Sequence, residues 1–142
     1  MKPKRILLFL ILFVSCKEIK KDKESDNNTI TFGDVVDLSK LEKVTMYNNS
    51  GKFELTAAQR GKLKKELAKM EYEKSIAVKL GSIYIELIID GKKCGITSGT
   101  HKKHIEVHKS SLTNSKGLPA ERDWFYFKTN GVNFDNYKKE NK

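Results

Sequence analysis

Long hydrophobic runs are almost absent from this 142-residue sequence. The one extended run, residues 6–14, consists of nine consecutive apolar residues. As a helix it would reach only about 14 Å, whereas the hydrocarbon core of a bilayer is roughly 30 Å thick. The run therefore does not predict a permanent membrane span.

Arginine is also scarce. Of the 28 basic residues only Arg5, Arg60 and Arg122 are arginines, and with 18 acidic residues the net charge is +10. Specific recognition of phosphates and bases favours the planar, bidentate guanidinium of arginine over the ammonium of lysine. The positive charge is therefore typical of a solvated, lysine-rich surface, and we expect no nucleic-acid partner.

Motifs for catalysis or cofactor binding are missing too. The sequence has no P-loop, no glycine-rich dinucleotide fingerprint, no H-E-x-x-H and no paired C-x-x-C. Residues 95–99 only approach the pattern G-x-S-x-G, because the serine is displaced by one position. Their expected context is also a hairpin, and not the strand-to-helix turn that the pattern requires. Nothing in the motifs predicts an enzyme or a cofactor.

The amino terminus, in contrast, carries a clear signal. Lys2, Lys4 and Arg5 precede the apolar run, and Ser15 and Cys16 follow it directly. A cationic start, a short apolar run and a small residue before the cleavage point are typical of a secretory signal peptide.

The cysteine at the cleavage point makes this segment resemble a bacterial lipoprotein precursor. The matching residues are Phe13-Val14-Ser15-Cys16, in place of a lipobox made of Leu, a small residue, Gly/Ala/Ser and Cys; Phe13 departs from the usual Leu. The resemblance implies cleavage before Cys16 and transfer of diacylglycerol, which carries fatty acids such as palmitate, to its thiol. It also implies lipid anchoring in the bacterial cell envelope, for which we expect the outer membrane.

The remaining chain divides into a tether and one domain. After Cys16, residues 17–28 carry a single apolar side chain among balanced charges and cannot offset the entropy of ordering. Residues 16–28 are thus expected to be a lipidated cysteine with a disordered tether, and residues 29–142 a single small domain. With Cys16 acylated, Cys94 is the only free thiol, so no intramolecular disulfide can form.

The first half of this domain shows mixed patterns. Residues 30–38 fit either an edge strand or a segment that wraps around the core. Residues 41–47 predict a strand, and the turn-forming residues 48–51 end it. Thr56 and Gln59 have the spacing of a capping box and predict the start of a helix. Its apolar stripe consists of Leu63, Leu67 and Met70, with the helix ending near Met70.

Three turn signals organise residues 75–107. Gly81-Ser82 predicts a type II′ turn, Asp90-Gly91 a type I′ turn, and residues 99–102 a four-residue loop. The resulting registers place Leu80 opposite Ile83, Leu87 opposite Cys94, Ile85 opposite Ile96 and Ile96 opposite Ile105. All these side chains share one face, so the three turns agree on one buried sheet surface.

Aromatic residues gather at the end of the chain. Residues 124–127 (Trp-Phe-Tyr-Phe) predict a last strand, after a long polar loop at 109–123. Six of the 13 aromatics lie between Trp124 and Tyr137, which indicates that the C-terminal segment belongs to the core. The fold class that follows is α+β, with one amphipathic helix packed on an antiparallel sheet of four to six strands.

The histidines and Cys94 are the candidates for chemistry. His101, His104, Glu106 and His108 offer an alternative function, a small hydrolase or metal-dependent envelope enzyme. On a strand, however, His104 and His108 stand about 13 Å apart, too far to share a metal. We therefore expect His104, Glu106 and His108 on a solvated outer face without a metal. Cys94 is expected on the core face, where a raised pKa makes its thiol inert.

The leading hypothesis is a membrane-anchored envelope lipoprotein with a small non-catalytic binding domain. Strand alternation separates Trp124 and Tyr126 from Phe125 and Phe127, so one pair faces away from the helix. If Trp124 and Tyr126 are outside, they form a binding surface for an envelope protein or a glycan. In the alternative interpretation, residues 30–38 or the long polar loop cover them.

Overall fold

The computed structural model describes residues 28–74 and 76–141. The expected signal peptide, the lipidation site Cys16 and all but the last residue of the expected tether lie outside the described residues. The helices are α1 (Phe32–Val35) and α2 (Ala57–Ala68), and the short 3-10 helices are η1 (Leu38–Lys40), η2 (Lys109–Ser111) and η3 (Phe134–Asn136). The strands are β1 (Leu41–Asn48), β2 (Gly51–Glu54), β3 (Glu71–Tyr72), β4 (Leu80–Ile89), β5 (Lys92–Gly99), β6 (His104–His108) and β7 (Trp124–Lys128).

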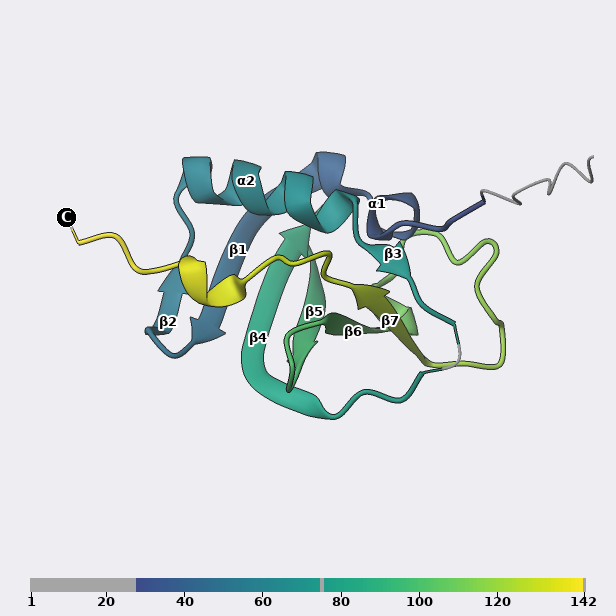
Figure 1. The fold of residues 1–142 in the computed structure, drawn as a ribbon. Coiled ribbons are helices and arrows are strands. Elements are labelled where there is room, and N and C mark those ends of the chain that lie inside the picture. The colour runs from purple at the N-terminus through teal and green to yellow at the C-terminus, as the bar shows by residue number, and fades with distance from the viewer. Residues whose placement is uncertain (1–27, 75, 142) are drawn as a thin grey trace, which may run out of the picture.

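These strands form one seven-stranded antiparallel sheet in the order β2-β1-β4-β5-β6-β7-β3. Helix α2 lies over one face of this sheet (Figure 1). The expected α+β class, with a helix on an antiparallel sheet, is confirmed, but the expected count of four to six strands is too low. Strands β2 and β3 have only four and two residues, too few to show a clear alternation in the sequence.

The capping box starts α2 as the sequence predicts. The Thr56 hydroxyl accepts the Gln59 backbone N–H at 3.3 Å, and the Gln59 side chain accepts the Thr56 backbone N–H at 3.1 Å. The apolar stripe of Leu63, Leu67 and Met70 is fully buried against the sheet and its flanking segments. None of the helices within the described ranges is both long and apolar enough to cross a membrane.

The β4–β5 hairpin follows the predicted register. Asp90 and Gly91 have φ angles of 51° and 72°, as a two-residue type I′ turn requires. Leu87 then pairs with Cys94, and Ile85 pairs with Ile96. A turn with positive φ at both positions matches the twist of the flanking strands. The two turn residues were therefore sufficient to predict the register of the hairpin.

The predicted turn at Gly81-Ser82 is wrong. Strand β4 runs through these residues without reversing, and its register with β5 shifts between Leu80 and Tyr84. A Cβ atom at Gly81 would lie 3.0 Å from the carbonyl oxygen of Gly99. Glycine is therefore present because two backbones approach closely at an irregularity of the sheet, which is the other common use of glycine in a strand.

The β5–β6 register is two residues from the prediction. Ile96 pairs with Val107 instead of Ile105, and Ser98 pairs with Ile105, because the connecting loop is residues 100–103. A slip of two residues leaves every side chain on its expected face. Ile105 and Val107 are accordingly fully buried.

Residues 30–38 wrap around the core and do not form an edge strand. Phe32 and Val36 are fully buried, and the described residues of this segment make only a single bridge to the sheet, between Thr31 and Glu71. The carboxylate of Asp34 accepts the backbone N–H of Thr31 at 2.7 Å, which favours a helical turn at this point. The alternative of a wrapping segment is therefore confirmed.

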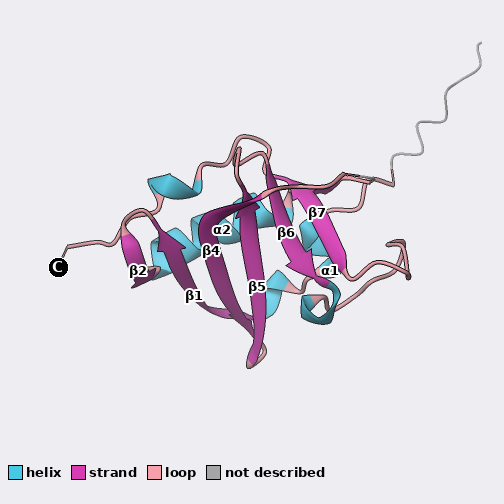
Figure 2. Ribbon diagram, turned by 90° about the horizontal axis from the view of Figure 1, so that it is seen from below, coloured by secondary structure: helices cyan, strands magenta, loops and turns pink. Residues whose placement is uncertain are grey.

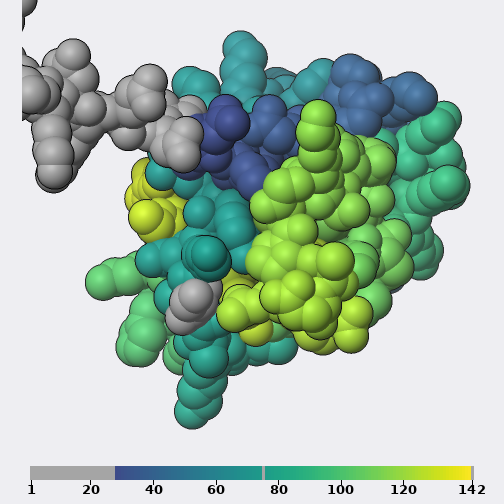
Figure 3. All heavy atoms as spheres, turned by 90° about the vertical axis from the view of Figure 1, so that its right-hand side faces the viewer, coloured from purple at the N-terminus to yellow at the C-terminus, as the bar shows by residue number. Residues whose placement is uncertain are grey.

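The long polar loop packs against this wrapping segment. Thr113 donates its backbone N–H to the carbonyl of Val35 at 2.8 Å, and its hydroxyl accepts the backbone N–H of Asp37 at 2.9 Å. Figure 3 shows the green loop lying directly against the purple wrapping segment. The loop thus covers one side of the core.

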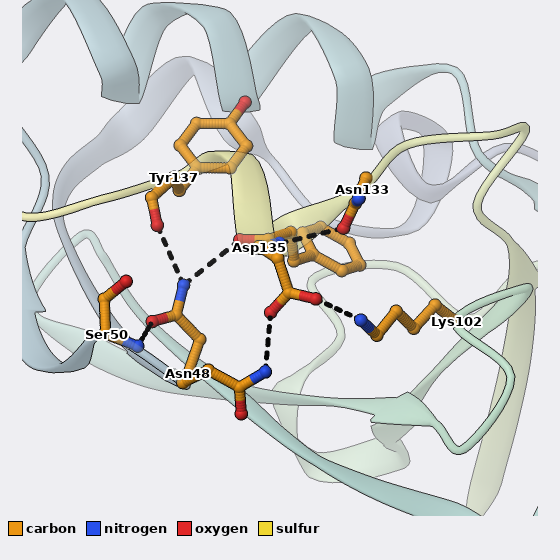
Figure 4. Close-up of polar contacts among 8 residues, drawn as sticks. Asn48, Ser50, Lys102, Asn133, Asp135 and Tyr137 are labelled. Atoms are coloured by element: carbon orange, nitrogen blue, oxygen red, sulfur yellow. Dashed lines mark hydrogen bonds and ion pairs between the residues drawn. The ribbon is translucent and has the colours of Figure 1, made fainter.

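The C-terminal segment belongs to the core, as expected. Phe134 and Tyr137 are buried, and the Tyr137 hydroxyl donates a hydrogen bond to Glu66 of α2. The side-chain amide of Asn48 donates to the carbonyls of Phe134 and Tyr137 at 3.2 and 2.8 Å (Figure 4). An ion pair between Lys102 and Asp135 fixes the same segment from the β5–β6 loop.

Candidate binding face of the sheet

The second face of the sheet carries no helix within the described residues. Figure 2 views the molecule from this side, with the strands in front and α2 behind them. Alternation sends every second side chain of β1, β4, β5, β6 and β7 to this side. We call this surface the open face. Its side chains include Tyr47, Tyr84, Thr97, Glu106, His108, Trp124 and Tyr126.

Trp124 is the most exposed large hydrophobic side chain of the open face among the described residues. It retains 48% of its accessible surface, although Phe125 and Phe127 beside it are buried in the core. His108 is its cross-strand partner, and the two rings meet edge to face with centroids 4.6 Å apart. The Nδ1 atom of His108 lies 2.7 Å from the Ser110 hydroxyl, which fixes the imidazole. The indole is therefore held in place while its surface remains accessible.

Next to this ring pair lies a carboxylate with little access to water. Glu106 is only 7% exposed and stands opposite Tyr126 on β7 and Thr97 on β5. Burial, followed by a hydrogen bond to the Glu106 carboxylate, raises the pKa of the half-buried Tyr126 above its ordinary value. The positive charge of Arg122 acts on the same pKa in the opposite direction.

The expectation of a fully solvated set at His104, Glu106 and His108 is wrong in one respect. All three side chains point to the predicted outer side, but Glu106 is buried and both histidines are only half exposed. The reason is that the neighbouring strand β7 supplies Tyr126 opposite Glu106 and Trp124 opposite His108, which alternation within β6 alone cannot reveal.

A second pair of aromatics lies at the other end of the open face. Tyr47 and Tyr84 pack with ring centroids 5.5 Å apart. The Tyr84 ring also covers Gly95, because a Cβ atom there would lie 2.5 Å from the Tyr84 hydroxyl oxygen. Sequence reasoning missed this pair. The available signal was a glycine within a strand, which often marks a place where another group approaches closely.

His104 has a partner that the sequence did not suggest. Its Nε2 atom lies 2.5 Å from the Glu73 carboxylate, which follows β3 and comes from 31 residues earlier in the chain. These two side chains and His101 line a shallow hollow of about 620 Å³ at the β5–β6 loop. The structure therefore brings His101 and His104 together with Glu73, whereas Glu106 and His108 do not line this hollow.

No group of three metal-ligating side chains is arranged around a common point within residues 28–74 and 76–141. The Glu73–His104 pair alone supplies two ligands, fewer than a structural or catalytic zinc site uses. The described part of the chain thus offers no built metal centre.

Cys94 lies on the core face, as predicted from the hairpin register. It is 2% exposed, and burial raises the pKa of its thiol to about 11. A thiol with such a pKa is almost entirely protonated near neutral pH and is a poor nucleophile. A cavity of about 350 Å³ opens beside it, lined among others by Lys40, Lys93 and Ser111.

No protein-family model, no curated protein and no solved structure matches this chain.

Proposed function

We propose that this chain is a bacterial envelope lipoprotein, anchored to a membrane through acylated Cys16, whose domain is a non-catalytic binding module. Its binding surface is the open face, centred on Trp124 and Tyr126. The anchor is supported by the signal peptide pattern and by the lipobox-like residues that precede Cys16.

The observation that carries the binding role is the exposure of Trp124. Burial of a large aromatic ring is favourable, yet this ring remains 48% exposed beside a well-packed core. Because His108 already holds the indole, a partner loses little conformational entropy of the protein when it packs there. Rigid aromatic side chains presented in this way are common centres of binding energy.

The anchor is tested by metabolic labelling with a fatty acid. We expect incorporation into the wild-type chain and none into Cys16→Ala, which should also leave the membrane fraction or remain uncleaved. Two or more acyl chains give stable anchoring, so the shift between fractions should be large. Label that persists in Cys16→Ala would contradict the proposed anchor.

The binding role is tested by capture from detergent-solubilised envelope with three forms of the chain. Trp124→Ala removes the ring on the open face, and Leu80→Ala removes a comparably exposed apolar side chain, 46% accessible, at the start of β4. We expect wild type and Leu80→Ala to retain the same components and Trp124→Ala to lose them. Identical retention by all three forms would argue against the open face as the binding surface. Thermal melting checks that all three forms of the chain are folded.

A hydrolase remains a second candidate because of the Glu73–His104 pair. A carboxylate that holds an imidazole is the arrangement of an orienting group and a general base. Among the described residues, however, no serine, threonine or cysteine side chain is hydrogen-bonded to His104. Hydrolysis of a chromogenic ester or phosphate that disappears in both His104→Ala and Glu73→Gln would favour this candidate; equal background rates would exclude it.

A further inference from the structure

The two edges of the sheet differ in how the chain protects them. At the β3 edge, residues 30–32 lie along the outer side of the strand, where Tyr72 donates its backbone N–H to the carbonyl of Ile30 at 2.8 Å. At the β2 edge, no hydrogen bond from another described segment reaches the outer side of the strand. Figure 2 shows β2 as the outermost strand at its end of the sheet, with the C-terminal tail (residues 138–141) beside it. One edge is thus closed by the chain itself, and the other is open.

The hydrogen bonds of the β1–β2 hairpin show which backbone groups point to the open edge. Leu55 donates its backbone N–H to the carbonyl of the opposed residue Val44 at 3.0 Å. In an antiparallel pair, hydrogen-bonded and non-hydrogen-bonded residues alternate along the strand. Phe53 therefore bonds to β1, whereas the N–H and C=O groups of Lys52 and Glu54 point away from it. A hollow of about 940 Å³, lined by residues 52–56 and 139–141, opens along this stretch.

The side chains of the same strand form an alternating pattern of charge. Lys52 and Glu54 are exposed on one side of the strand, while Phe53 between them points into the core and is 6% exposed. Lys43 of β1 contacts the Oε2 atom of Glu54 at 2.9 Å, which leaves Oε1 for another donor. The open edge thus presents a cation and an anion two residues apart.

We propose that β2 pairs with β2 of a second copy of this chain, antiparallel and about a two-fold axis at Phe53. Lys52 of each copy then lies opposite Glu54 of the other copy, and each of these two pairs exchanges two backbone hydrogen bonds. The β2 edge lies five strand spacings, or about 24 Å, from the strand that carries Trp124. Self-association through β2 is therefore independent of the proposed binding role of the open face.

Charge selects this register among those that the open edge allows. Only residues whose backbone groups point outward can exchange hydrogen bonds, so the register can change only in steps of two residues. A step in one direction places Lys52 opposite Lys52 of the second copy, and a step in the other places Glu54 opposite Glu54 of the second copy. Like charges directly opposite each other are destabilising, whereas unlike charges are stabilising. The register centred on Phe53 is the one that pairs unlike charges.

The same pattern favours a second copy over a foreign strand. Lysine on an edge strand often prevents pairing, and a strand with lysine alone would repel a copy of itself. Glu54 changes this result, because a two-fold axis turns one lysine and one glutamate into two ion pairs. A second copy supplies the complement by symmetry, whereas a foreign strand needs an acid and a base at the same spacing in reverse order.

Native mass spectrometry of the full chain, released from detergent micelles, counts the copies directly. The interface is formed by a strand of four residues, and small interfaces bind weakly. The chain is therefore titrated to high concentration, with micelles in large excess over chains so that two copies do not share a micelle by chance. We expect a dimer whose fraction rises with the concentration of the chain, which gives its dissociation constant.

Charge reversal at the edge tests the register. Lys52→Glu and Glu54→Lys each place two like-charge pairs across the axis, and each should weaken the dimer by about tenfold or more. An equimolar mixture of the two variants should recover the dimer, because unlike pairs form again between the two chains; nitrogen-15 labelling of one variant identifies the mixed dimer by its mass. Lys116→Glu, which reverses an exposed charge of the long polar loop, should leave the dissociation constant unchanged.

Three results would overturn the proposal. The chain could remain monomeric at every concentration, or all variants could dimerise equally, which would assign the association to another surface. The mixture could also fail to recover a dimer that each single reversal weakens, which would contradict the register.

Carbodiimide cross-linking in cells that produce the chain then identifies what occupies the edge. A cross-linked dimer joined through Lys52 and Glu54 supports the second copy. A link from either residue to a different protein would overturn the second copy in favour of a foreign strand.

Discussion

The covered face and the open face are built from alternate residues of the same strands, yet their side chains differ in kind. On the covered face Ile85, Leu87, Ile96, Val107 and Phe127 are all fully buried. On the open face the same strands carry tyrosines, a buried carboxylate and a half-exposed tryptophan. The contrast indicates that the covered face provides most of the stability, while the open face is free to carry recognition.

The largest difference should appear between two aromatics that lie three residues apart on β7. Phe127→Ala creates a core cavity and should destabilise the domain by about 3–5 kcal/mol. Trp124→Ala removes a ring that is 48% exposed and should cost about 1 kcal/mol. Denaturant unfolding measures both values. Equal costs would show that the open face is part of the stabilising core.

The pH dependence of stability tests whether water is excluded from the covered face around Cys94. The Cys94 thiol has a pKa of about 11 in the folded domain, against a reference value of 9.0. Because the pKa of the thiol is higher in the folded than in the unfolded chain, the unfolded chain loses its thiol proton first as the pH rises. The contribution of Cys94 to the free energy of unfolding is therefore complete below pH 9 and is lost as the pH rises toward 11. Two pKa units correspond to about 2–3 kcal/mol.

Cys94→Ala is the matched control for this series, since it retains every lysine and tyrosine that titrates in the same range. We expect the melting temperature of wild type to fall more steeply than that of Cys94→Ala between pH 9 and 11. Parallel curves would mean that water reaches Cys94, and rapid reaction of the native thiol with a labelling reagent would show the same.

The sequence predicted most of the covered face because its signals are local, but it wrongly placed Leu80, which is 46% exposed, on that face. The type I′ turn at Asp90-Gly91 fixes the pairing of Leu87 with Cys94, and the Thr56–Gln59 capping box starts α2 at the expected place. Even the two-residue slip between β5 and β6 left the buried side chains on the correct face. The alternation of side chains between the two faces depends only on the two-residue period of a strand, so a register error of two residues does not change it.

The open face was harder to predict because its contacts join distant segments. Alternation separated Trp124 and Tyr126 from the core aromatics, but it could not say whether another segment covers them. The Glu73–His104 pair depends on β3, a strand of two residues without any pattern. Gly81 was misread as part of a turn because its real role, a close approach to Gly99, is a tertiary contact.

The smallest expected effect concerns the packing of tyrosine on glycine in the open face. Gly95→Ala places a Cβ 2.5 Å from the Tyr84 hydroxyl oxygen, so the flexible end of the ring must move, at a cost of about 0.5 kcal/mol. In a Tyr84→Ala background the same change should be neutral or stabilising, since alanine suits a strand better than glycine. A double-mutant cycle by denaturant unfolding measures the coupling, and additive effects would contradict the contact.

Radical footprinting with mass spectrometry tests most directly the proposal that a partner covers the open face in a bacterial envelope. The purified chain and the chain in native envelope are oxidised in parallel, and modification of Trp124, Leu80 and Phe127 is compared. We expect Trp124 to be modified in the purified chain and protected in the envelope, Leu80 to be modified in both, and Phe127 in neither. Equal oxidation of Trp124 in the two samples would contradict a partner on the open face.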